Sequence, residues 1–241
     1  MPAQIDLDPL DELIDIASDL PVLFEEADML VARLDLSSHW HTAILAALVN
    51  TDAKLYSWQR KVRSQLSRHI YRAVPSRLHN PTDDEYGNKL YPFALQFESL
   101  HVATYFTNSW GIVLQTLASI LRLLDALPKS SIYSPAIDEL YSPVMSQMED
   151  SHVLEEFVHE PTDSIRLEAD KLARYLCLSV EYCHRIEMGA LGPQTMTYAQ
   201  WVMRSYYEDI GAERELTWCL NIDKMTGPGL RCGMKMMAFQ G

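Results

Sequence analysis

Apolar residues recur at helical spacing along almost the whole chain of 241 residues, whereas strand-like alternation of apolar and polar residues is nearly absent. This periodicity predicts helices, or helix pairs, over residues 8–17, 21–34, 38–74, 98–127, 162–188, 197–209 and 212–225. Segment 75–92 is dense in Pro, Asn, Asp and Gly and is expected to form a loop. Segment 133–161 is expected to hold short helices separated by prolines. We therefore expect a single all-α domain over residues 1–241.

Charge is unevenly distributed along a chain whose net charge is −13. Residues 1–35 carry ten acids against Arg33 alone, whereas residues 54–77 carry seven bases and no acid. Two interpretations stay open: the oppositely charged helices attract each other, or the basic segment forms a rim that steers an anionic substrate. Because the net charge repels phosphate, we expect no specific DNA binding.

The amino-terminal residues, the apolar segments and the cysteines predict where in the cell the protein is located. The first twenty residues hold six acids and no base, so we expect no signal peptide. Polar residues interrupt the longest apolar stretches, so we expect no membrane insertion. The four cysteines are separated by five, thirty-five and twelve residues, which fits no zinc pattern and predicts buried free thiols. The expected location is intracellular and cytoplasmic, or nuclear if the protein is a regulator.

Three patterns resemble metal motifs without completing them. The acidic triplet 83–85 resembles a magnesium motif but lacks a spaced third aspartate and lies in the expected loop. Glu156/His159 and Glu181/His184 have the E-x-x-H spacing of di-iron bundles, which also need two further glutamates. The simpler interpretation is that each pair consists of exposed neighbours on one helical turn. We predict no stoichiometric metal and no cofactor, because neither the cysteines nor the E-x-x-H pairs complete a coordination shell.

The most informative feature is a polar stripe on the otherwise apolar helix 98–127. Its members fall on one helical face, and they are His101, Thr104, Tyr105, Asn108 and Gln115. The helix that ends near residue 188 carries Tyr175, Ser179 and Tyr182 at four- and three-residue steps. Burying so many polar groups is costly unless they bond one another, water or a ligand. The stripe therefore predicts either an internal hydrogen-bond network that fixes helix register or an aromatic pocket with polar donors.

If the pocket exists, we assign its residues two kinds of role. The hydrogen-bond donors that would act on the reacting molecule are His101, Tyr105, Asn108 and Tyr182. The residues that would bind the molecule are Thr104, Trp110, Gln115, Tyr175, Ser179 and Trp201, with Trp110 and Trp201 as apolar walls.

Two stretches of sequence resemble the regulatory domain of fungal zinc binuclear cluster transcription factors. One is FESLHVATYFTNSW at 97–110, and the other is LCLSVEYC from Leu176, followed by Gly189, Gly192 and RELTWCL from Arg214. The resemblance covers about 150 residues and implies an all-helical fold that responds to small molecules. The DNA binding of that family depends on a separate six-cysteine zinc module, which this chain lacks.

The resemblance and the missing module together suggest two functions. The first is a cofactor-independent cyclase or isomerase, similar to a pericyclase, acting on a hydrophobic terpenoid or polyketide intermediate of fungal secondary metabolism. Such an enzyme would hold a flexible substrate in a reactive conformation and place a hydrogen-bond donor at a developing charge. The alternative is a regulator that does not bind DNA and instead binds a metabolite or a transcription-factor partner. The sequence leaves open a homodimer.

Overall fold

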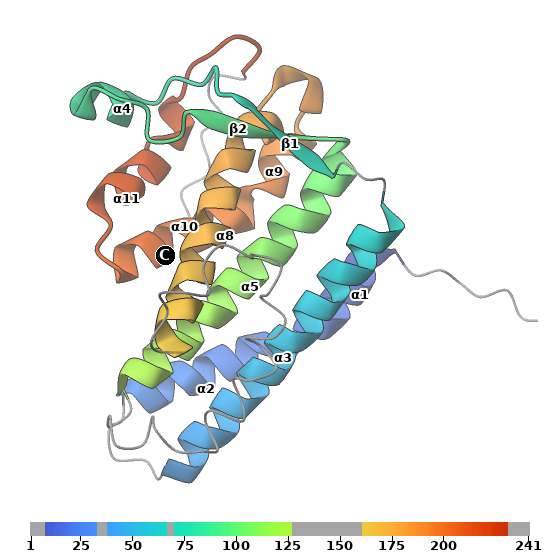
Figure 1. Ribbon diagram of the computed structural model, residues 1–241, viewed down its shortest axis with the longest axis vertical. Helices are drawn as coiled ribbons and strands as arrows, with labels where there is room; N and C mark the ends of the chain where they lie inside the picture. The colour runs from blue at the N-terminus through green and yellow to red at the C-terminus, as the bar shows by residue number, and fades with distance from the viewer. Residues whose placement is uncertain (1–7, 33–37, 67–69, 127–160, 231–241) are drawn as a thin grey trace, which may run out of the picture. The chain divides into compact units, whose positions relative to one another are not determined.

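The computed structural model describes residues 8–32, 38–66, 70–126 and 161–230, coloured in Figure 1. This part of the chain is largely helical and holds one two-stranded antiparallel sheet, so the expected helical character is confirmed. None of its helices is both long and apolar enough to cross a membrane. The predicted short helices within 133–161, together with Glu156 and His159, lie outside the described residues.

The chain divides into two compact units, each built from two stretches of sequence. Unit 1 comprises residues 1–65 and 112–171, and unit 2 comprises 66–111 and 172–241. Two of the boundaries fall inside helices α5 (Leu100–Ala126) and α8 (Pro161–Cys183), so both helices give residues to both units. That the whole chain forms a single domain stays a prediction.

In unit 1, helices α1 (Pro9–Ala17) and α2 (Leu20–Ala32) pack on the long helix α3 (Ser38–Gln65) (Figure 1). The α1–α3 contact is held by two polar links. The indole Nε1 of Trp58 donates to the carbonyl of Pro9 at 2.9 Å, and Lys61 forms an ion pair with Glu12 at 2.7 Å. The ion pair joins the acidic amino-terminal segment to the basic one, which fits the mutual-attraction interpretation of their charges.

Unit 2 contains the sheet and the carboxyl-terminal helices. Strands β1 (Tyr71–Pro75) and β2 (Phe93–Phe97) pair antiparallel, with Tyr71 opposite Phe97. The remaining elements are α4 (Pro81–Tyr86), the 3-10 helix η1 (Ile186–Met188), α9 (Leu191–Thr195), α10 (Thr197–Asp209), α11 (Glu213–Leu220) and the 3-10 helix η2 (Ile222–Lys224). Helix α11 packs against both α4 and α10.

The structure corrects several predicted bounds. The predicted helices 162–188 and 212–225 end at Cys183 and Leu220, and each is followed by a short 3-10 helix, η1 or η2. The helix predicted to run to residue 74 ends at Gln65, because 71–75 is the strand that pairs with 93–97. The predicted loop 75–92 contains helix α4, which begins where the Asn80 side chain accepts from the amide of Thr82. It ends at Gly87, whose φ of 69° is readily adopted only by glycine. Helix α10, by contrast, has the predicted bounds.

Candidate functional site

Six aromatic rings of unit 2 form one cluster around Trp110. The members of this aromatic cluster are Tyr71 and Phe97 of the sheet, Phe106 and Trp110 of α5, and Tyr175 and Tyr182 of α8. The Trp110 ring centroid lies 5.2 Å from that of Tyr175 and 5.6 Å from that of Tyr71. Tyr182 joins through Phe97, at 5.4 Å. Three of the residues predicted to form the site, Trp110, Tyr175 and Tyr182, therefore meet in one cluster.

Thr104 and Asn108 of the polar stripe lie on another face of α5, which is directed toward α9 and α10. The hydroxyl of Thr104 lies 3.4 Å from that of Thr195 on α9. One and two turns further along α5, Asn108 and Gly111 share the face of Thr104. At Gly111 the two helices approach so closely that an added Cβ would lie 2.9 Å from the ring of Tyr198 on α10.

This arrangement separates the predicted donors from the predicted aromatic wall. Successive residues of a helix are about 100° apart, so Asn108 and Trp110 are directed about 200° apart around α5. Trp110 contacts α8, whereas the face of Asn108 meets α9 and α10. A single pocket with both side chains on one wall is therefore incompatible with helix geometry, and the two groups of predicted residues must be considered separately.

Several stripe side chains bond the carbonyl oxygen one turn earlier on their own helix. The Thr104 hydroxyl donates to Leu100 at 2.8 Å, and the Asn108 amide donates to Thr104 at 2.8 Å. On α8, the Ser179 hydroxyl donates to the carbonyl of Tyr175 at 2.7 Å. These bonds lower the cost of burying the groups. Asn108 still has a second N–H and a carbonyl oxygen, so part of its hydrogen-bonding capacity is available to another group.

The other predicted residues have distinct surroundings. His101 is exposed, whereas Tyr105 and Gln115 are half-buried, and Gln115 belongs to unit 1. Tyr182 is buried within the aromatic cluster, and burial raises the pKa of its hydroxyl. Trp201 stands on α10 with 54% of its surface exposed, and its ring stacks on that of Tyr198 at 6.2 Å.

These contacts define a surface that we call the α5–α10 seam. Its members are Thr104, Asn108 and Gly111 of α5, Thr195 of α9, and Tyr198 and Trp201 of α10. Burial raises the pKa of the Tyr198 hydroxyl, so this phenol keeps its proton at neutral pH. The seam therefore combines a flat aromatic stack, a protonated phenol and a side-chain amide.

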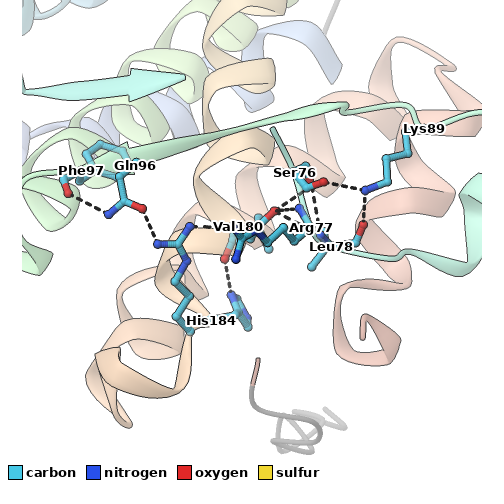
Figure 2. A network of polar contacts seen from close by, with 10 residues as sticks. Ser76, Arg77, Leu78, Lys89, Gln96, Phe97, Val180 and His184 are labelled. Atoms are coloured by element: carbon cyan, nitrogen blue, oxygen red, sulfur yellow. Dashed lines mark hydrogen bonds and ion pairs between the residues drawn. The ribbon is translucent and has the colours of Figure 1, made fainter. Parts of the chain in front are cut away.

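A second polar site of unit 2 is centred on Glu181, whose carboxylate is buried. Figure 2 shows the network of polar contacts around its partners Ser76, Arg77 and Leu78. The Glu181 Oε2 accepts hydrogen bonds from the Ser76 hydroxyl at 2.7 Å, the Arg77 amide at 3.1 Å and the Leu78 amide at 3.3 Å. Arg185 lies 3.8 Å from its other oxygen. With these donors satisfied, the carboxylate fixes the chain after β1 rather than serving as an accessible base.

His184, one turn after Glu181, has different partners. Its Nδ1 lies 2.9 Å from the Val180 carbonyl and its Nε2 lies 3.4 Å from the amide of Gln200. Burial lowers the pKa of the imidazole, more than the backbone bond raises it. The prediction that Glu181 and His184 are exposed neighbours is wrong, because Glu181 is buried and His184 is half-buried. In the described ranges, no group of three or more His, Cys, Asp or Glu is placed to hold a metal ion.

The sequence analysis missed a buried acid in unit 1. Asp52 on α3 is fully buried, and neither carboxylate oxygen has a hydrogen-bond partner among the described residues. Burial, and then the charge of Glu168, raise its pKa well above the usual range. The hydroxyl of Tyr56, one turn further along α3, donates to the carboxylate Oε1 of Glu168 at 3.3 Å. An aspartate on the apolar side of a helix, four residues before a tyrosine, is the only signal that the sequence offers for this group.

Comparison with known protein families, with curated proteins and with solved structures found no match for this chain. The resemblance to a fungal regulatory domain therefore stays a prediction, and any function must be argued from the residues themselves.

Proposed function

We propose that the protein is a cofactor-independent cyclase or isomerase that binds a hydrophobic substrate on the α5–α10 seam. The observation that supports this proposal is the stack of Tyr198 and Trp201, since the Tyr198 ring meets α5 at Gly111, which shares a helical face with Asn108. A half-exposed tryptophan offers a flat apolar surface, and the neighbouring donors give a bound molecule a fixed orientation.

The chemistry would need only conformational restriction and hydrogen bonding. A flexible polyene that lies along the aromatic stack would be held with its reacting carbons close together. If its conjugated carbonyl faced the seam, the Tyr198 hydroxyl or the Asn108 amide would donate to the oxygen as negative charge developed on it. The product would have the same elemental composition as the substrate, so no oxidant, reductant or leaving group is required.

The test uses linear polyenes that end in a conjugated carbonyl, and it measures products of unchanged mass but new chromatographic retention. Replacing Asn108 by Ala should lower the rate constant by about 10²–10³-fold, because a donor to the developing charge is lost. Trp201→Ala should mainly raise KM, since it removes part of the binding surface. Trp40→Ala is the matched control, because Trp40 is equally exposed (59%) but belongs to unit 1. Equal effects of the two tryptophan substitutions would refute the assignment of the seam.

The exposure of Trp201 also favours a second candidate, a regulator that binds a metabolite or a protein partner at the same surface. Exposed tryptophans are enriched among the residues that contribute most to protein–protein binding. Binding of the polyenes that depends on Trp201, without any product of equal mass, would favour this second function over the first.

A further inference from the structure

Three sulfur atoms from three helices meet in the interior of unit 2. The Cys177 Sγ of α8 lies 3.4 Å from the Met203 Sδ of α10 and 4.0 Å from the Cys219 Sγ of α11. All three residues are buried, and the three atoms belong to one unit. We call these residues the sulfur triad.

We propose that the sulfur triad is a binding site for a soft monovalent metal ion, of which Cu⁺ is the biological candidate. Metal–thiolate bonds are about 2.3 Å long, so two sulfurs at the corners of a trigonal site are about 4.0 Å apart. The Cys177–Cys219 separation has this value, and the Met203 sulfur, 3.4 Å from that of Cys177, is the candidate third ligand. The site is distinct from the α5–α10 seam and does not depend on the proposed function.

The ligand types select among metals. Thiolate and thioether sulfurs are soft donors that favour Cu⁺, whereas zinc sites use thiolate, imidazole and carboxylate. A zinc site would also need a fourth ligand, and the described part of the chain places no third His, Cys, Asp or Glu beside the two thiols. The proposal departs from the expectation of no stoichiometric metal, which rested on the spacing of the cysteines and of the E-x-x-H pairs and did not consider a thioether ligand.

The surroundings offset the charge of the occupied site. Two thiolates and one monovalent cation carry a net charge of −1, and binding releases two protons to solvent. The Arg204 guanidinium lies beside Cys219, donating to its carbonyl at 3.3 Å, and its buried Nε has no hydrogen-bond partner among the described residues. The hydrogen bond with Cys177 and burial raise the pKa of the Cys219 thiol, and Glu215 adds to this, so Arg204 offsets only part of the cost of forming the thiolate. The Tyr207 hydroxyl lies 3.9 Å from the Cys177 sulfur and can donate to a thiolate there.

The experiment titrates the protein anaerobically with Cu⁺ held by a competing chelator, both on the folded protein and during refolding. Cys232, which lies outside the described residues, is replaced by Ser in every sample. We expect one ion per chain by native mass spectrometry, and a higher Tm for the loaded protein, because the ion binds the folded state. Affinity should rise by up to about 100-fold per pH unit, because two protons are displaced.

Matched variants separate this site from other sulfur chemistry. Cys219→Ser should weaken Cu⁺ binding by at least about 100-fold, and Met203→Leu, which keeps the packing volume, by about 10-fold. Cys183→Ser is the control, because Cys183 is an equally buried free thiol on α8 outside the triad, and it should bind as the parent does. The proposal is overturned if no ion binds by either route, if Cu⁺ lowers Tm, or if Met203→Leu and Cys183→Ser change the affinity equally.

Discussion

The most unusual single residue is Asp52, a fully buried carboxyl for which the described part of the chain provides no hydrogen-bond partner. Burying a charged carboxylate in this way is far more costly than burying its neutral form, so folding favours the protonated acid. Asp52 is therefore a source of instability that depends on pH rather than a contact that holds the fold together.

Asp52→Asn should make the protein more stable at neutral and alkaline pH. The pKa of Asp52 is higher in the folded than in the unfolded state, so the folded state binds more protons and stability falls as pH rises between the two values. The stability gained by the variant should be absent near pH 4 and then grow by up to about 1.4 kcal/mol per pH unit. Urea melts between pH 4 and 9 measure this difference. Glu25→Gln, at an exposed site on α2, should show no such growth.

Single residues of α5 also show what the sequence could and could not predict about the site. Helix geometry places Asn108 and Trp110 on opposite sides of α5, so their separation was predictable from the sequence alone. That Asn108 shares a face with Gly111 was equally predictable. The identity of the partner was not, because the contact of Gly111 with Tyr198 joins residues far apart in sequence, and no local pattern specifies such a pairing.

At the scale of elements, long helices were predictable and short strands were not. Helix α10 begins and ends at the predicted residues because its apolar periodicity is uninterrupted. Strands β1 and β2 have only five residues each, and their stability depends on pairing with each other across an intervening helix. A run as short as Tyr71–Pro75 gives too few periods to distinguish a strand from the end of a helix.

Gly192 of α9 lies very close to the backbone at the end of α8. An added Cβ there would lie 2.1 Å from the backbone oxygen of Cys183 and 2.6 Å from the Cβ of Met188. Because backbone cannot yield as a side chain can, Gly192→Ala should lower the free energy of unfolding by at least about 2 kcal/mol. Gly111→Ala is the comparison, since the obstacle there is the Tyr198 ring, which can turn. If chemical denaturation showed equal losses of unfolding free energy in the two variants, this account of Gly192 would be contradicted.

The chain after β1 is tied to α8 through Glu181. In Glu181→Gln one acceptor oxygen is replaced by a donor, so the amides of Arg77 and Leu78 compete for fewer lone pairs. We expect these two amides to exchange their hydrogens faster, while amides within α10 keep their protection. Unchanged exchange at both positions would show that Glu181 does not fix this segment.

At the scale of the whole molecule, the net charge of −13 argues against nucleic acid as a partner. We predict that DNA binding, if measured by mobility shift near physiological salt, is no tighter than about 10⁻⁶ M and independent of sequence. The basic residues at 54–77 would contribute only a salt-sensitive component. Binding that discriminates between DNA sequences at this salt concentration would contradict this prediction and overturn the preference for the cyclase.

The five tryptophans differ in their exposure to water, so their fluorescence reports how the protein unfolds. Trp40 and Trp201 are exposed to water, whereas Trp58, Trp110 and Trp218 are almost fully enclosed. Excited indoles in water emit at longer wavelengths and are quenched by acrylamide, so the emission should separate into two populations. Each unit holds one exposed indole and at least one enclosed indole. Single tryptophan-to-phenylalanine replacements would therefore reveal, by colour and quenching, whether the two units lose their structure in one step or in succession.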